Sequence, residues 1–144
     1  MATQIIICTE ILSMSVKYYN ENAETFFTGT VNVNMAHLYS GFIALLPTGG
    51  HILDAGCGAG RDTLEFKKLG YQVTAMDASP DLAALAYKHT GQQVRIQTFD
   101  QVSEISHFDG IWACASLLHV PREALHHNTN CLVRALKTGG VLYA

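Results

Sequence analysis

The sequence predicts an α/β protein built on a parallel sheet with helices on both faces, a doubly wound arrangement. Short apolar segments that are typical of buried strands alternate with segments of helical period, and this alternation indicates β-α-β units. A glycine-rich turn at residues 56–60 joins the first of these strands to the helix that follows it. The length of 144 residues suits a single domain.

The composition narrows the classes of function. Apolar residues make up 49% of the chain and charged residues 15%, which favours a packed core over disorder. The net charge of −3 and the lack of a basic run argue against nucleic acid as the main partner. The apolar stretch near the N-terminus is too short for a signal peptide or a membrane span, and the four cysteines form no C-x-x-C pair. We therefore expect a cytoplasmic protein with free thiols and no membrane partner.

The N-terminal third precedes the alternating pattern. Residues 1–13 are expected to be an N-terminal extension, because Met14 opens a segment that resembles a natural N-terminus; a short strand or helix turn is the alternative. Residues 14–50 are expected to hold a lid and a helix, with helical period over residues 30–46. The apolar stripe of this helix comprises Met35, Leu38, Tyr39, Phe42, Leu45 and Leu46.

The first β-α-β unit is predicted from residue 51 onward. Residues 51–55 and 72–77 indicate buried strands, and residues 61–69 indicate the helix between them, ended by a glycine that tolerates positive φ. The expected packing residues of this helix are Leu64, Phe66 and Leu69. Ser79 and Pro80 form a helix start, since serine caps and proline fits the first turn, and this helix extends to about residue 90 and ends at Gly91.

The second half repeats the alternation. Residues 94–98 and 108–115 indicate the third and fourth strands, and residues 121–136 a helix whose inward residues are Leu125, Leu132, Val133 and Leu136. A turn at residues 138–140 leads into a fifth strand at residues 141–143. We expect this last strand to leave an apolar edge that favours association of two copies. A fragment of a longer protein and a degenerate homologue are the other interpretations.

The glycine turn carries the strongest chemical signal. The segment is Leu53-Asp54-Ala55-Gly56-Cys57-Gly58-Ala59-Gly60, in which the glycines let the backbone turn sharply beside a ligand. A dinucleotide fingerprint needs a glycine where Arg61 stands. A carboxylate at Asp54 would repel a pyrophosphate and suit a cation. The turn therefore favours a positively charged, phosphate-free ligand.

This segment resembles motif I of class I S-adenosylmethionine-dependent methyltransferases. It is similar to their tellurite-resistance and thiopurine-type small-molecule branch, whose loop often continues with arginine and a polar residue, as Arg61-Asp62 does. The resemblance implies a Rossmann-like domain over residues 51–144 with strand order 3-2-1-4-5, truncated after strand five. It implies methyl transfer from S-adenosylmethionine to a small-molecule acceptor. A non-catalytic S-adenosylmethionine-binding module and an NAD(P)-dependent oxidoreductase are the alternatives.

The resemblance also assigns roles at the cofactor. Asp77 ends the second strand and would accept both ribose hydroxyls, while Ala78 would line the adenine. Asp100 would lie near the adenine amino group, with Phe99 as a wall. The complete set of expected cofactor-binding residues is Tyr18, Tyr19, Asp54, Ala55, Gly56, Cys57, Gly58, Gly60, Arg61, Asp77, Ala78, Phe99, Asp100 and Ala115.

A pair of tyrosines and a histidine complete the candidate site. Tyr18 and Tyr19 resemble an N-terminal lid that closes over the sulfonium, and simple packing is the alternative. His119 follows strand four and is the candidate catalytic residue, as a base or in orienting the acceptor; a packed, hydrogen-bonded histidine is the alternative. The pair His126-His127 does not predict a metal site, because adjacent helical residues point about 100° apart.

Overall fold

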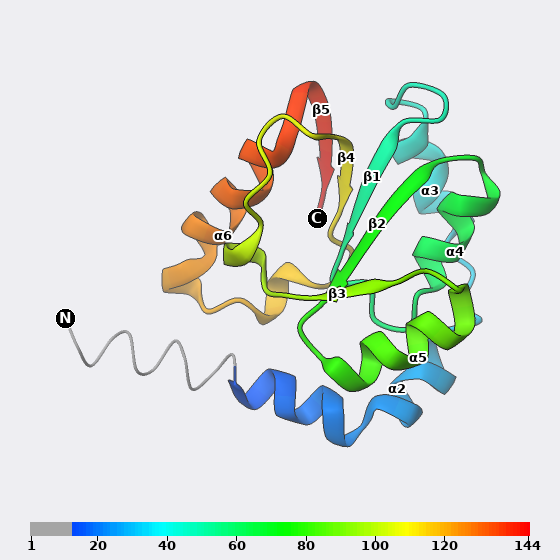
Figure 1. Ribbon diagram of the computed structural model, residues 1–144, viewed down its shortest axis with the longest axis vertical. Coiled ribbons are helices and arrows are strands. Elements are labelled where there is room, and N and C mark those ends of the chain that lie inside the picture. Colours follow the sequence, from blue (N-terminus) through cyan, green and yellow to red (C-terminus); the bar gives the residue numbers. More distant parts are fainter. Residues whose placement is uncertain (1–12) are drawn as a thin grey trace.

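The computed structural model describes residues 13–144, so all but the last residue of the predicted extension lies outside the described residues (Figure 1). A helix at residues 13–21, called here the N-terminal helix, is followed by α2 (Ala23–Thr30) and α3 (Ala36–Ile43). The predicted continuous helix over 30–46 is therefore wrong. Helix α2 ends at Thr30 and α3 begins at Ala36. Between them, the side-chain carbonyl oxygen of Asn34 accepts a hydrogen bond from the Ala36 N–H at 2.9 Å, and this local turn competes with helix.

The predicted parallel sheet and its strand order are confirmed. The five strands pair in the order β3-β2-β1-β4-β5, and every pair is parallel. They are β1 (His51–Ala55), β2 (Gln72–Asp77), β3 (Val94–Ile96), β4 (Phe108–Trp112) and β5 (Leu136–Tyr143). The first two strands have the predicted bounds, whereas the fourth ends earlier, because the chain turns away and reaches a positive φ of 53° at Ala115. The fifth begins earlier and contains a register shift against β4.

The helices α4 (Arg61–Lys68), α5 (Pro80–Thr90) and α6 (Arg122–Ala135) connect the strands. The predicted helix signals of α5 are confirmed: the Ser79 hydroxyl accepts a bond from the Leu82 N–H at 3.2 Å, and Gly91 ends the helix at φ 66°. Two short 3-10 helices, η1 (Phe99–Gln101) and η2 (Leu117–His119), follow β3 and β4. Both lie at the end of the sheet where the strands terminate.

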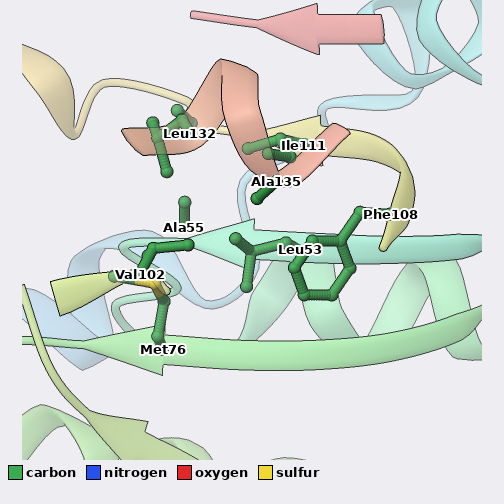
Figure 2. Packing of buried hydrophobic residues seen from close by; sticks show 9 residues of the cluster. Leu53, Ala55, Met76, Val102, Phe108, Ile111, Leu132 and Ala135 are labelled. Carbon is green, nitrogen blue, oxygen red and sulfur yellow. The ribbon is translucent and has the colours of Figure 1, made fainter. Parts of the chain in front are cut away.

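Helices cover both faces of the sheet, as predicted. On one face, Leu132 and Ala135 of α6 pack on Leu53 and Ala55 of β1, as Figure 2 shows. On the other face, α3 and α4 bury an aromatic cluster that includes Trp112. Because alternate strand side chains point to opposite faces, most apolar residues of β1 and β4 join one of these two cores. Ala75 and Val94 pack in a third cluster with Ala86 of α5, and Ile96 is exposed. Four residues expected to pack are exposed instead: Leu125 and Val133 on the exposed side of α6, and Leu45 and Leu69, which lie just beyond the ends of α3 and α4.

Strand β5 forms one edge of the sheet and pairs with β4 alone. Among residues 13–144, no helix has the length and apolar character needed to cross a bilayer. Nor do the described residues contain a group of three or more histidine, cysteine, aspartate or glutamate side chains placed to hold a metal ion.

Candidate active site

A cavity of about 770 Å³ opens at the carboxyl ends of β1, β2 and β4. Such a volume is typical of a site for a small molecule or cofactor. Its walls come from the glycine turn after β1, the segment after β2, η1, the segment after β4, the N-terminal helix and α2. In open α/β sheets, ligands bind at the carboxyl ends of the strands, beside the point where successive strands switch from one side of the sheet to the other. In this sheet that point lies between β1 and β4.

The glycine turn is held against β2 by its backbone. The Gly56 and Cys57 N–H groups both donate to the Met76 carbonyl oxygen, at 2.9 and 2.8 Å. Gly56 has φ 83°, and a Cβ atom built on it would lie 2.5 Å from the Ser116 Cβ. No side chain fits there, because that approach is shorter than any real contact between carbon atoms. The turn and the segment after β4 therefore meet at Gly56.

Asp77 connects the turn to the next strand. One carboxylate oxygen accepts from the Gly58 N–H at 2.8 Å, and the other accepts from the Ser79 N–H at 2.9 Å. Burial raises the pKa of this carboxyl group, and the two backbone donors act in the opposite direction. Each oxygen keeps a lone pair for a further donor, so the side chain can accept two hydroxyl groups from a ligand in the cavity.

Asp54 does not reach the cavity wall. It shares a face of β1 with Ile52, since alternate side chains point the same way, and it is buried beneath α4, where it accepts a hydrogen bond from the Thr63 hydroxyl at 2.6 Å. Burial, and then the nearby charge of Asp62, raise its pKa to about 8. Asp77 lines the cavity whereas Asp54 does not, and the cofactor-binding role expected for Asp54 stays a prediction.

This burial predicts a pH dependence of stability. Between the ordinary pKa of 3.8 and the value of about 8, Asp54 binds a proton in the folded chain and not in the unfolded one. The contribution of Asp54 to the free energy of unfolding therefore falls as pH rises through that window. We expect Asp54→Asn to remove the slope, so that urea unfolding from pH 5 to pH 8 shows the wild type losing about 1 kcal/mol per pH unit relative to the variant. Parallel curves for the two proteins would disprove this.

Arg61 lies on the cavity wall in a fixed orientation. Its Nε and one terminal nitrogen donate to the two oxygens of Asp62, at 2.6 and 3.1 Å. Asp62 also accepts from the Tyr39 hydroxyl and, at 2.8 Å, from the Trp112 indole. Burial would lower the pKa of Arg61, but the bonds and the charge of Asp62 raise it overall. The remaining guanidinium nitrogen lies 3.4 Å from the Thr30 carbonyl oxygen, and Arg61 lines the cavity.

Tyr19 and His119 meet across the cavity mouth. The Tyr19 hydroxyl lies 2.7 Å from His119 Nε2, and the two rings are in edge contact with centroids 5.2 Å apart. Burial lowers the pKa of His119 and raises the pKa of Tyr19. The hydrogen bond joins the N-terminal helix to η2, two segments 100 residues apart in the chain.

Most of the predicted cofactor residues line this one cavity. They are Tyr19, Gly56, Cys57, Gly58, Arg61, Asp77, Ala78, Phe99, Asp100 and Ala115, joined by the candidate catalytic residue His119. Four do not: Asp54 and Ala55 lie within β1, Gly60 packs on α5, and Tyr18 borders a smaller hollow beside Tyr19 and His119. A Cβ atom at Gly60 would lie 2.7 Å from the Thr90 methyl group, so this glycine serves helix packing.

Several residues of the cavity wall are not among the predicted site residues. Phe26 and Thr30 come from α2, and Met35 and Asp62 also lie on the wall. The spacing of Ala23, Phe26 and Thr30 at one helical face is a signal that could have indicated α2. No local signal connects Asp62 with Trp112, 50 positions away.

The sheet order and the glycine turn define a Rossmann-like ligand-binding domain. Residues 52–140 match the methyltransferase domain family, and the chain belongs to that family.

Curated relatives agree with this assignment. Ubiquinone biosynthesis O-methyltransferase of Xanthomonas axonopodis pv. citri is 34% identical over 110 residues, which cover 69% of this chain and 44% of the relative. The enzyme of the same name from Xanthomonas campestris pv. campestris strain B100 is 31% identical over 106 residues. The chain thus spans less than half the length of the curated relatives it matches.

Solved structures share the fold. The 1,6-didemethyltoxoflavin-N1-methyltransferase of Burkholderia thailandensis, solved with S-adenosylhomocysteine and 1,6-didemethyltoxoflavin, aligns with a TM-score of 0.70 and 25% identity, covering 90% of this chain and 58% of that one. A TehB-like SAM-dependent methyltransferase from Corynebacterium glutamicum aligns with a TM-score of 0.68 and 23% identity, covering 90% and 72%.

Proposed function

We propose that this chain binds S-adenosylmethionine and transfers its methyl group to a small-molecule acceptor. The observation that carries the proposal is the pairing of Asp77 with the glycine turn at one end of the cavity, in a chain of the methyltransferase domain family. The names of the curated relatives, both O-methyltransferases, and the S-adenosylhomocysteine bound in the Burkholderia structure support it.

The charges around the cavity fit this ligand. Its wall carries three carboxylates, Asp62, Asp77 and Asp100, and one guanidinium, Arg61, whose fork is already engaged by Asp62. A pyrophosphate would meet an excess of negative charge there, whereas an ammonium and a sulfonium would be attracted. This balance disfavours the alternative of an NAD(P)-dependent oxidoreductase.

Each wall segment has a proposed role. Asp77 would accept the ribose hydroxyls, with Ala78 beside the adenine, and Phe99 and Asp100 of η1 would complete the adenine wall. Arg61 would hold the carboxylate of the methionine part. When bound, S-adenosylmethionine supplies an electrophilic methyl group. The protein's contribution is position and exclusion of water, for which the N-terminal helix with Tyr19 lies over the mouth.

The charge and the cysteines of the chain bear on its partners and its location in the cell. The net charge of −3 favours a small acceptor over nucleic acid. Three cysteines are free among residues 13–144, which supports a reducing, cytoplasmic setting. Association of two copies through the edge strand β5 stays a prediction, which sedimentation velocity tests.

The proposal is tested by incubating the chain with methyl-labelled S-adenosylmethionine and a phenol, a thiol or an amine. We expect label in at least one acceptor, and loss of that label in the Asp77→Asn variant. Binding of the donor without label in any acceptor would favour the non-catalytic binding module instead. Failure to bind the donor would contradict the proposal altogether.

A further inference from the structure

We propose that Tyr19 and His119 form a proton relay, in which Tyr19 takes the proton of a phenolic acceptor and His119 receives the proton that Tyr19 gives up. This inference rests on the proposed methyl transfer and names its acceptor class. Tyr19 becomes a catalytic residue in this account, beyond the lid role expected from the sequence.

The position of the Tyr19 hydroxyl is fixed from several sides. Its ring makes edge contacts with Tyr18, Phe26 and His119, at centroid distances of 5.5, 5.2 and 5.2 Å. These contacts leave the hydroxyl 2.7 Å from His119 Nε2, and both side chains line the cavity. The pair is therefore set in place before an acceptor arrives, as a proton-transfer group must be.

The relay requires a hydrogen bond from the Tyr19 hydroxyl to His119 Nε2. Burial lowers the pKa of His119, which favours a neutral ring, and in the Nδ1–H tautomer of that ring Nε2 is the acceptor. Burial, then the charges of Tyr18 and Asp77, raise the pKa of Tyr19, so its hydroxyl keeps its proton and donates. A hydroxyl has one donor and two acceptor sites. Tyr19 can thus donate to His119 and still accept a hydrogen bond from an acceptor in the cavity.

The step balances in atoms and charge. The phenolic oxygen forms a bond to the methyl carbon of the sulfonium donor, the methyl–sulfur bond breaks, and its electron pair stays on sulfur. The phenolic proton moves to the Tyr19 oxygen as the Tyr19 proton moves to His119 Nε2. The positive charge lost from sulfur is then on the His119 ring, where the charge of Asp77 favours it. Water removes this proton and restores the neutral pair.

The strength of the base selects the acceptor. A histidine whose pKa is lowered from 6.5 can take the proton of a phenol, with a pKa near 10, far more readily than that of an aliphatic alcohol, a much weaker acid. The rim of the mouth also suits an aromatic ring, because Met14, Tyr18 and Leu118 expose apolar surface beside Tyr19 and His119. Both arguments point to a phenolic hydroxyl.

The relay is tested without turnover by ¹⁵N NMR of the His119 ring, in the complex with S-adenosylhomocysteine and 4-nitrophenol. We expect the ring proton on Nδ1 and an Nε2 shift typical of a hydrogen-bond acceptor in the wild type. The signal should disappear in His119→Gln, and the hydrogen-bond shift of Nε2 should be lost in Tyr19→Phe. The matched controls Tyr87→Phe and His37→Gln replace exposed residues away from the cavity and should behave as wild type.

The kinetic arm compares 4-nitrophenol with 4-nitrothiophenol as acceptor. Tyr19→Phe should lower kcat for the phenol about 100-fold, with KM nearly unchanged, and should change the thiol reaction less than 3-fold, since a thiolate needs no base. If S-adenosylhomocysteine binds but Nε2 of His119 carries the ring proton, or the wild type does not bind the phenol, the relay is overturned. If S-adenosylhomocysteine itself does not bind, the proposed function fails instead.

Discussion

Replacing Asp77 with asparagine is expected to weaken binding of S-adenosylhomocysteine about 100-fold. The carboxylate accepts from the Gly58 and Ser79 N–H groups and offers its remaining lone pairs to the ribose hydroxyls. An asparagine turns an NH2 group toward one of these donors and removes the charge. Hydrogen bonds to a charged group contribute about 1.5–3 kcal/mol each, and a loss of about 2.7 kcal/mol corresponds to that factor. Isothermal calorimetry measures it.

The matched control for this variant is Asp81→Asn. Asp81 lies in the first turn of α5, four residues beyond Asp77, and is exposed and absent from the cavity wall. Its replacement changes the net charge by the same amount. An equal loss of affinity in both variants would therefore mean that the net charge of the protein, and not a contact made by Asp77, determines the affinity. Unchanged affinity in Asp77→Asn would remove this residue from the site.

The Gly56→Ala variant is expected to lose about 3 kcal/mol of unfolding free energy. Gly56 has φ 83°, which costs a residue with a Cβ atom about 1–2 kcal/mol, and the new methyl group would lie 2.5 Å from the Ser116 Cβ. Ser116 is itself held by a hydrogen bond from its hydroxyl to the Ala55 carbonyl oxygen at 2.7 Å, so the segment after β4 must move. Urea unfolding measures the loss, and calorimetry should show weaker binding of S-adenosylhomocysteine.

Gly70→Ala separates backbone strain from steric conflict. Gly70 has φ 87°, close to that of Gly56, but nothing lies within 4 Å of a Cβ atom built there. We expect a loss of about 1 kcal/mol from strain alone, with binding unchanged. Equal losses in the two variants would show that the contact between Gly56 and Ser116 has no energetic consequence.

Much of the fold could be predicted because its signals are local. The strand at residues 51–55 has an apolar run and a glycine turn behind it, and α5 begins with a serine cap followed by proline. Local signals also misled at residues 30–46, because Thr30 ends α2 and the apolar stripe, which starts at Met35, belongs to the separate helix α3. The Asn34 side chain bonds to the backbone at that break, and hydrophobic periodicity does not register such a bond.

The site was predictable where the backbone alone determines position. Asp77 ends β2, so its place beside the glycine turn follows from the parallel sheet. Asp54 lies one residue inside β1, and the alternation of the strand turns it beneath α4, so it does not line the cavity. The Tyr19–His119 pair and the bond from Trp112 to Asp62 depend on tertiary packing over 100 and 50 positions, which no local pattern encodes.

The central claim is that this cavity takes a cationic, phosphate-free methyl donor. Calorimetric titration of the chain with S-adenosylmethionine, S-adenosylhomocysteine and NAD(P) tests it most directly. We predict saturable binding of the first two at a ratio of one per chain, weakened in Asp77→Asn and retained in Asp81→Asn, and no binding of NAD(P). Saturable uptake of NAD(P) by a folded sample that ignores both sulfur compounds would contradict the account.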